Sequence, residues 1–345
     1  MIWYLEEGPE QDVVISTRVR YARNIANMPF PWRLSPEERD YVKVRVADAF
    51  GKLCDRRQEK ALTVNLDELG DIESLALSER RVISRSMLRD TRGKALLLFP
   101  DESSGILVNE EDHLRLFALS SGLRLDETKM AAEACAIAME ERLPFAKSER
   151  YGYLTACPTN TGTGMRASAM MHLPGLARTG VLNKMAEQLS KTGYALRGAK
   201  GEGSSAEADM IQLSNQVTLG VTEEQILEAF GRLVLDVADE ERRARRALYE
   251  HDPVALEDEI GRAEGQLMFA GKMSAQEAYK LLSLLRLGRE LNIAGTPDYP
   301  VIQRLLNNMG EGSVQQEAGR TLDKQARDIR RAAILRNTLN GGNRS

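Results

Sequence analysis

The sequence predicts an α+β domain, with a largely antiparallel sheet flanked by helices, followed by an all-helical C-terminal domain. Over residues 1–236, short β-like runs interleave with helical segments without the regular alternation of βαβ units. After about residue 236, only helical periodicity is present. We therefore expect one domain over residues 1–236 and a second over residues 237–345, with a disordered tail over residues 340–345.

The individual elements follow from local signals along the chain. A helix should begin at Ser35, because Pro36 and two glutamates follow this cap residue. Thr222 and Gln225 form a capping box that opens another helix. Other helices are expected at Asp126–Phe145, Val181–Leu189, Glu240–Arg246 and Ser274–Leu291, with a break at Gly295–Pro300. Strands are expected at Val13–Ser16, Ala61–Leu66, Ala95–Phe99, Gly105–Asn109, Tyr151–Ala156 and Met210–Ser214.

Composition narrows the classes of function. The 345 residues have a net charge of −4, a pI near 5.7 and 42% hydrophobic residues, which is typical of a soluble globular protein without nucleic-acid or membrane partners. The cysteines form no CxxC pair, and the N-terminus lacks the pattern of a signal peptide, so a cytoplasmic location is favoured. The histidines lack ligand spacing, so we expect no metal site made of protein side chains. We take His113 and His172 to be structural.

Arginine, glycine and acidic residues gather in segments where turns are expected. Five arginines in these segments are candidates to clamp a triphosphate together with Mg²⁺: Arg18, Arg20, Arg115, Arg166 and Arg197. A guanidinium binds phosphate oxygens bidentately, and phosphoryl transfer depends mainly on positioning and charge neutralisation. For any single arginine, a solvated surface position is about as plausible. Arg18 and Arg20 alternate along a predicted strand, so both should point to one face.

Two other segments resemble nucleotide-binding motifs, but the neighbouring sequence argues against both. Gly162–Ala167 formally matches G-x-G-x-x-A after a plausible strand. However, Pro174 and Gly175 follow too soon for a good helix, and no acidic residue stands about 20 residues later to hold a ribose. The run GAKGEGSS is not a P-loop, because its lysine comes too early. A dinucleotide site is therefore rejected.

Four blocks of sequence carry a family resemblance: STRVRYARN, NEEDHLR, ACPTNTGTGMRAS and RGAKGEG with the following DMIQLSNQVTLGVTE. In this order, from about Asp12 to Phe230, they resemble the catalytic-domain motifs of the phosphagen (guanidino) kinases. The resemblance implies that the chain has the fold of the phosphagen kinases and that ATP is its phosphoryl donor. It assigns ATP binding to Ser16, Thr17, Arg18, Val19, Arg20, Arg115, Arg166, Ala167, Ser168, Ala169, Met170, Arg197, Gly198, Ala199, Lys200, Gly201 and Glu202, with Arg81 as a basic contact on the adenine side.

The same resemblance assigns the acceptor side to Glu111, Glu202 and Cys157. A guanidinium is a poor nucleophile, because its lone pairs are delocalised and its pKa exceeds about 12. Two carboxylates can orient it, and one of them can accept the proton that leaves. A thiolate beside arginines can position the substrate cation. The alternative for Cys157 is a small apolar filler of the core, as we expect for Cys54 and Cys135.

The acceptor is expected to be an arginine side chain on a protein. In this sequence about fifteen residues precede the first block, where small-substrate kinases carry a helical domain with a lid, and a helical domain follows instead. This order resembles the bacterial protein-arginine kinases, whose RDxxRA motif matches Arg327, Asp328, Ile329, Arg330, Arg331 and Ala332. The resemblance implies an allosteric phosphoarginine site there. The alternatives are a small-molecule guanidino kinase and a non-catalytic adaptor, and the intact arginines, glutamates and cysteine argue against the adaptor.

The resemblance also implies the biological setting. Expected partners are arginine-bearing protein substrates, a small zinc-binding activator protein, and a Clp ATPase–protease that degrades the marked proteins. Stress repressors would be among the substrates and would be inactivated. A homodimer or a higher homo-oligomer is expected.

Overall fold

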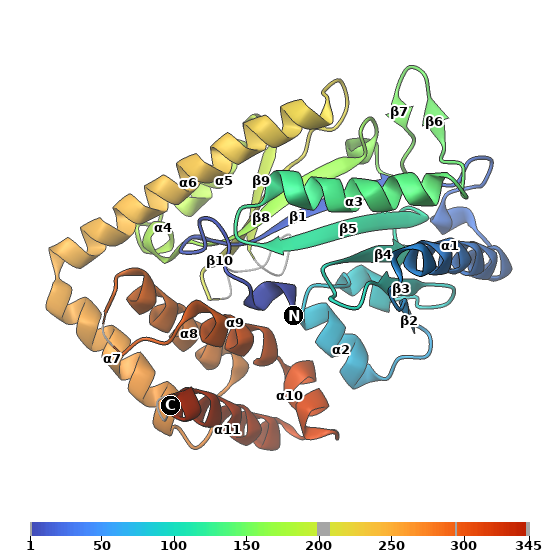
Figure 1. Cartoon of the computed structure of the whole chain (residues 1–345). Helices are drawn as coiled ribbons and strands as arrows, with labels where there is room; N and C mark the ends of the chain where they lie inside the picture. The colour runs from blue at the N-terminus through green and yellow to red at the C-terminus, as the bar shows by residue number, and fades with distance from the viewer. Residues whose placement is uncertain (1, 199–207, 294, 343–345) are drawn as a thin grey trace.

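The computed structural model describes residues 2–198, 208–293 and 295–342 (Figure 1). Eight strands form one sheet in the order β2-β3-β4-β5-β1-β8-β10-β9, and every neighbouring pair is antiparallel. Their bounds are β1 Val14–Arg23, β2 Leu62–Asn65, β3 Ala95–Leu98, β4 Ser104–Val108, β5 Leu114–Ser121, β8 Met165–His172, β9 Tyr194–Gly198 and β10 Met210–Asn215. A separate hairpin pairs β6 (Lys147–Ser148) with β7 (Gly152–Tyr153). The predicted α+β class is confirmed.

Helices cover the sheet and fill the C-terminal part of the chain. The first group comprises α1 Pro36–Arg57, α2 Asp71–Glu79, α3 Leu125–Glu140, α4 Pro174–Arg178, α5 Leu182–Lys191 and α6 Glu223–His251. The second comprises α7 Pro253–Phe269, α8 Ala275–Glu290, α9 Tyr299–Asn308, α10 Glu311–Ala318 and α11 Lys324–Gly342. Short 3₁₀ turns are η1 Trp3–Leu5, η2 Pro31–Arg33, η3 Arg85–Leu88 and η4 Pro158–Asn160. Both predicted helix starts are present, since capping boxes join Ser35 to Glu38 and Thr222 to Gln225.

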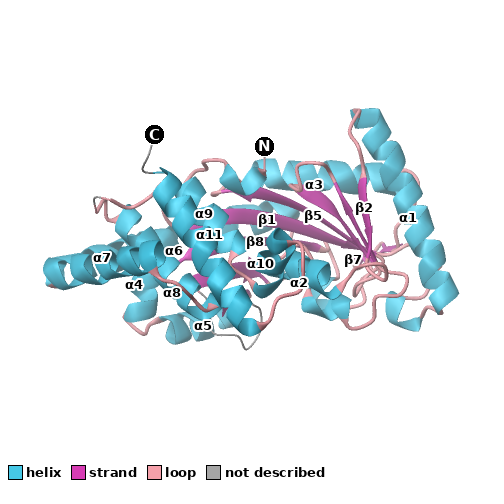
Figure 2. Ribbon diagram, turned by 90° about the horizontal axis from the view of Figure 1, so that it is seen from below, coloured by secondary structure: helices cyan, strands magenta, loops and turns pink. Residues whose placement is uncertain are grey.

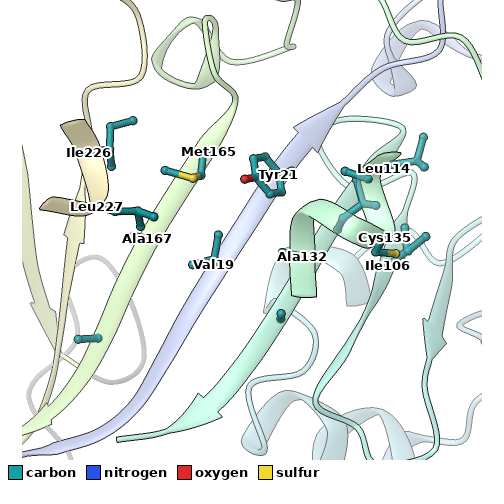
Figure 3. Packing of buried hydrophobic residues seen from close by; sticks show 14 of the residues in the cluster. Val19, Tyr21, Ile106, Leu114, Ala132, Cys135, Met165, Ala167, Ile226 and Leu227 are labelled. Carbon is teal, nitrogen blue, oxygen red and sulfur yellow. The ribbon is translucent and has the colours of Figure 1, made fainter. Parts of the chain in front are cut away.

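One face of the sheet forms the main hydrophobic core. Val19 and Tyr21 of β1 and Ala167 of β8 lie in this core, opposite apolar residues of α3 and α6 (Figure 3). Because side chains alternate along a strand, the residues between them, including Arg18 and Arg20, point to the other face. The alternation predicted for these two arginines is therefore present.

The C-terminal helices pack together beside the other face of the sheet (Figures 1 and 2). Leu281 and Leu285 of α8 share a hydrophobic cluster with Leu335 of α11, and Met170 and Met210 of the sheet extend it. At the far end, α10 packs on α2, where the Glu79 carboxylate accepts hydrogen bonds from the backbone N–H groups of residues 312 and 313, each at 2.9 Å. The helical group is thus attached to the sheet at two places.

Several boundaries differ from those expected. The helix predicted at Asp126–Phe145 ends at Glu140, and the strand predicted at Tyr151–Ala156 is reduced to β7. Helix α6 continues without a break across residue 236, so a single 29-residue helix joins the two expected domains, and their division at that residue stays a prediction. Helix α11 continues through Gly342, past the start of the tail expected to be disordered. In the described ranges, no helix combines the length and the apolar character needed to cross a bilayer.

Candidate active site

Strand register gathers the predicted arginines on one face of the sheet. Arg20 of β1 lies opposite Arg166 of β8, and Arg18 lies opposite Ser168. On the other side of β1, Arg115 of β5 pairs with Ala22, two residues from Arg20. Register also connects Ser16 through Met170 and Gln212 to Arg197 of β9. Since residues that pair directly point to the same face, all five arginines lie on the face opposite α3.

Within this cluster, Arg18 and Arg20 have like-charged neighbours, whose effect Glu110 offsets in part. Burial, with Arg115 nearby, lowers the pKa of Arg18 to about 10. Burial also lowers the pKa of Arg20 well below its ordinary value, and the neighbouring Arg18, Arg115 and Arg166 add to that effect. The buried Nε atoms of Arg18 and Arg20 have no hydrogen-bond partner in the described part of the chain. Such a cluster destabilises the empty protein and favours a polyanion.

A turn between β4 and β5 supplies two carboxylates beside this cluster. Arg115 forms ion pairs with Glu110 and with Glu111, the latter at 3.4 Å. The Glu110 side chain is 6% exposed and accepts a hydrogen bond from Ser84, whereas the Glu111 side chain is 44% exposed. Glu111 is therefore the carboxylate that an incoming molecule can reach.

The next residue of the turn fixes the loop that carries Cys157. The Asp112 carboxylate accepts hydrogen bonds from the Asn24 side chain at 2.6 Å and from the backbone N–H of Ala156 at 2.7 Å. Burial raises the pKa of this carboxyl group. Burial also lowers the pKa of His113 to about 4, and the Nδ1 atom of its neutral ring accepts from the Ile25 N–H. Residues Asp112 and His113 thus hold Glu111 and the Cys157 loop in fixed relation.

Cys157 belongs to a polar chain that ends on the arginine cluster. Its Sγ atom lies 3.0 Å from the Thr159 hydroxyl, which accepts a hydrogen bond from Arg166 Nη2 at 2.8 Å. Arg166 Nε donates to Asn160 Oδ1, also at 2.8 Å. Because the Thr159 oxygen already accepts from Arg166, its proton is free to point at the sulfur. Cys157 is partly exposed, unlike the buried Cys54 and Cys135, so it is not a filler of the core.

Comparison with known proteins identifies the family of this site. Residues 41–244 match the ATP:guanido phosphotransferase, C-terminal catalytic domain, and residues 253–345 match the protein-arginine kinase McsB C-terminal domain. Protein-arginine kinases from Halothermothrix orenii, Symbiobacterium thermophilum and Bacillus subtilis are 38%, 41% and 36% identical to the chain over 98% of its length, and the matches cover 96%, 96% and 93% of theirs. The chain belongs to the protein-arginine kinase family. The predicted enzyme class, a guanido phosphotransferase, is thereby confirmed.

Solved structures support the same fold. A taurocyamine kinase from Schistosoma mansoni, determined with bound components of a transition-state analogue, is similar with a TM-score of 0.61 and 25% identity over 68% of this chain and 34% of that one. A lombricine kinase is similar with a TM-score of 0.58 and 23% identity over 67% of this chain and 66% of its own. The catalytic half of this protein-arginine kinase family member therefore has the phosphagen kinase fold.

Other residues predicted to bind ATP are distributed over both faces of the sheet. Ser16, Ser168 and Met170 share the arginine face, and the Arg81 backbone carbonyl accepts from Arg18 at 3.2 Å. The structure does not bring the side chains of Thr17, Val19, Ala167 and Ala169 to that face, because they lie buried on the α3 side. Gly198 ends β9. Ala199, Lys200, Gly201 and Glu202 lie outside the described residues.

The predicted phosphoarginine motif lies in the first half of α11, and its arginines have different surroundings. Arg331 is 1% exposed and donates to the carbonyls of Met309 and Met273 and to the Asp328 carboxylate. Arg330 forms a bidentate pair with Glu317. Arg327 is partly exposed and lies 3.6 Å from Glu311. Ile329 is exposed, and Ala332 is buried. Arg331 therefore has a structural role, because it links α11 to the backbone at Met273 and Met309.

Sequence reasoning did not single out several residues that shape the site. Glu110, Asp112 and Thr159 all stand inside the motifs that carry the resemblance, but spacing alone does not tell which of two adjacent glutamates faces inward. Thr159 follows Cys157 by two residues. Its contact with Arg166 depends on the pairing of the strand that carries this arginine. Across the described ranges, no group of three or more His, Cys, Asp or Glu side chains is arranged to hold a metal ion.

Proposed function

We propose that this chain transfers the γ-phosphoryl group of ATP to the guanidino group of arginine side chains in proteins. The observation that carries the proposal is the row of arginines across β5, β1, β8 and β9, which meets Glu111 and Cys157 at one end. The family membership also supports this proposal, since the relatives named above are protein-arginine kinases. Arg18, Arg20, Arg115, Arg166 and Arg197 would bind the phosphates of ATP. Mg²⁺ would be held chiefly by those phosphates, and it would supply further neutralisation of their charge.

On the acceptor side, Glu111 and Glu202 would hold the substrate guanidinium between two carboxylates, and one of them would take its proton. The Thr159 hydroxyl would donate to a Cys157 thiolate, which would then face the substrate cation. Arg115 connects the two halves, since its ion pair with Glu111 is the contact that a bound phosphate and acceptor would compete for. Phosphate binding would therefore release Glu111 toward the acceptor.

We also propose the finer roles that the family suggests. Phosphorylation would mark proteins for a Clp protease and inactivate stress repressors in the cytoplasm, with a small zinc-binding protein as activator. Phosphoarginine would bind at Arg327 and Asp328, which are partly exposed, and would promote activity or assembly of a homo-oligomer. Arg331 would act there by orienting Asp328, to which it donates at 2.7 Å.

The deciding experiment is intact-mass analysis of a model protein after incubation with the full chain and Mg·ATP. We expect phosphate additions that acid removes and alkali leaves, which is the behaviour of N–P bonds, and their loss when the acceptor's arginines are replaced by lysine. Comparable kcat/KM for free arginine would instead assign a small-molecule kinase. Binding of ATP without transfer to any acceptor would assign an adaptor. Wild-type transfer by Glu202→Ala would exclude that glutamate from the acceptor site.

A further inference from the structure

A buried polar network joins the C-terminal helices to the sheet at the end of β8 opposite Arg166. Its centre is His172, the last residue of β8, whose side chain is 0% exposed. His172 Nδ1 lies 2.9 Å from Glu290 Oε1, and Nε2 lies 2.9 Å from Ser283 Oγ, both on α8. The Ser283 hydroxyl in turn donates to Asp209, which directly precedes β10. One imidazole ring thus connects α8 to two strands.

Counting hydrogens decides the charge of this ring. Ser283 has one hydroxyl proton, and it is donated to Asp209 at 2.5 Å. The serine oxygen must therefore accept from His172 Nε2, which has to carry a proton. The other ring nitrogen faces a carboxylate of Glu290, which accepts but does not donate when it is ionised. Both ring nitrogens of His172 consequently need a proton, unless one of the two carboxyl groups is neutral.

The surroundings favour ionised carboxylates. Glu290 lies 3.1 Å from Arg286 Nε and 3.2 Å from Arg245 Nη1, and these cations stabilise its negative charge. Asp209 is only partly buried, so water can also solvate it. Beyond this pair of arginines, Arg245 also pairs with Glu241 and lies 3.7 Å from Asp12, which pairs with Arg242. A cationic His172 is the remaining source of the missing hydrogen.

We propose that His172 is a positioning residue that carries both ring protons at neutral pH and thereby fastens α8 onto the ends of β8 and β10. Strand β8 also carries Arg166, which contacts Thr159 beside Cys157. The attachment of the C-terminal helices would thus depend on one proton and would set the position of a strand of the candidate active site. Loss of that proton would leave Nδ1 and a carboxylate oxygen facing each other without a hydrogen.

The first test measures the protonation of the ring directly, by long-range ¹H–¹⁵N correlation of the histidines in the full chain at pH 7.5. His251→Gln removes the exposed histidine and leaves two rings. We expect one neutral ring, which is His113, because burial lowers its pKa to about 4, and one ring with two protonated nitrogens, which is His172. An exposed histidine is largely neutral at this pH, so a doubly protonated ring is diagnostic. Two neutral rings would overturn the proposal, whatever the activity of the chain.

The second test asks whether the proton matters for the reaction. In Glu290→Gln, the amide can donate to Nδ1 of a neutral ring, while Arg245 and Arg286 lose their carboxylate partner at every pH. We expect the turnover of the wild type divided by that of Glu290→Gln to fall about tenfold between pH 6.5 and pH 9. The matched control is Glu259→Gln, which breaks the exposed Arg178–Glu259 pair between α4 and α7 and involves no histidine. Its ratio to the wild type should stay constant with pH.

Stability gives a readout that needs no kinase activity. The folded chain would hold a proton that the unfolded chain releases, so the free energy of unfolding should decrease as the pH rises from 7 to 9. That decrease should be lost in Glu290→Gln and kept in Glu259→Gln. Equal pH dependence in all three chains would refute the proposal. This arm rests on folding alone, so failure of the proposed arginine phosphorylation would leave it unaffected.

Discussion

Replacement of Arg20 by methionine should stabilise the protein without nucleotide and weaken its binding of ATP. Arg20 is partly buried among Arg18, Arg115 and Arg166, and its Nε atom has no hydrogen-bond partner in the described structure. Methionine fills a similar volume without a charge. Replacing a whole buried ion pair with apolar side chains is neutral or stabilises by up to about 4 kcal/mol, and because only one partly exposed cation is removed here, we expect roughly 1–2 kcal/mol.

The loss of binding follows from the same contacts. A hydrogen bond to a charged group contributes about 1.5–3 kcal/mol, so losing one or two such bonds to phosphate should raise the Kd of Mg·ATP about a hundredfold. At a concentration 100 times the wild-type Kd, ATP should stabilise the wild type by about 2.7 kcal/mol and the variant by far less. Urea unfolding followed by circular dichroism, with and without Mg·ATP, measures both effects, and titration calorimetry gives Kd.

Arg23→Met is the matched control, because it removes the same group from the same strand. Arg23 is 2% exposed, donates to the Thr163 carbonyl at 3.0 Å and lies 3.4 Å above the Tyr153 ring. Its loss leaves an acceptor unpaired, so we expect destabilisation of roughly 1–3 kcal/mol with unchanged ATP affinity. The reasoning is refuted if Arg20→Met is less stable than the wild type without nucleotide, or if the two variants bind ATP equally well.

Three further predictions address other parts of the chain. Cys157→Ser should lower kcat at least about tenfold with little change in the Kd of ATP, while Cys54→Ser should keep the wild-type kcat and affect only stability. Because burial lowers the pKa of His113 to about 4, its contribution to stability, roughly 3 kcal/mol, should be present above about pH 6.5 and lost as the pH falls toward 4. His113→Asn, whose Oδ1 can accept from Ile25, should lack that part of the acid dependence. Arg331→Ala should reduce the free energy of unfolding by roughly 3–5 kcal/mol, whereas Arg327→Ala should change it by under about 1 kcal/mol, as urea titration can establish.

The features predictable from sequence are those whose causes are local. The capping boxes at Ser35 and Thr222 need only four consecutive residues, and both form as expected. The common direction of Arg18 and Arg20 needs only the alternation of a strand. The presence of Arg166 opposite Arg20 instead depends on which strands pair and in what register, with 145 residues of chain between them. Composition and periodicity contain no signal for that distance, and only the resemblance to a family supplied it.

The same limit explains which details of the site were missed. A motif of seven residues places Glu110, Glu111 and Asp112 side by side, yet they have three different surroundings. Glu110 pairs with Arg115 in the interior, the Glu111 side chain is exposed, and Asp112 holds the Cys157 loop. These differences arise from Ser84, Asn24 and Ala156, which belong to distant segments. A side chain's partners, and hence its pKa and role, are properties of the assembled fold.

Two pairs of arginines in the described residues have opposite surroundings, which the sequence does not distinguish. Arg331 meets backbone carbonyls and a carboxylate, and Arg245 meets Glu241 and Glu290, so each is satisfied within the protein and stabilises its own region. Arg18 and Arg20 have neighbours of like charge and donors without acceptors. A fold that holds such groups together is less stable than it would be with apolar residues there, and a polyanion would remove that cost. The close approach of like charges, more than the number of arginines, therefore marks the face of the sheet on which the phosphates of ATP should bind.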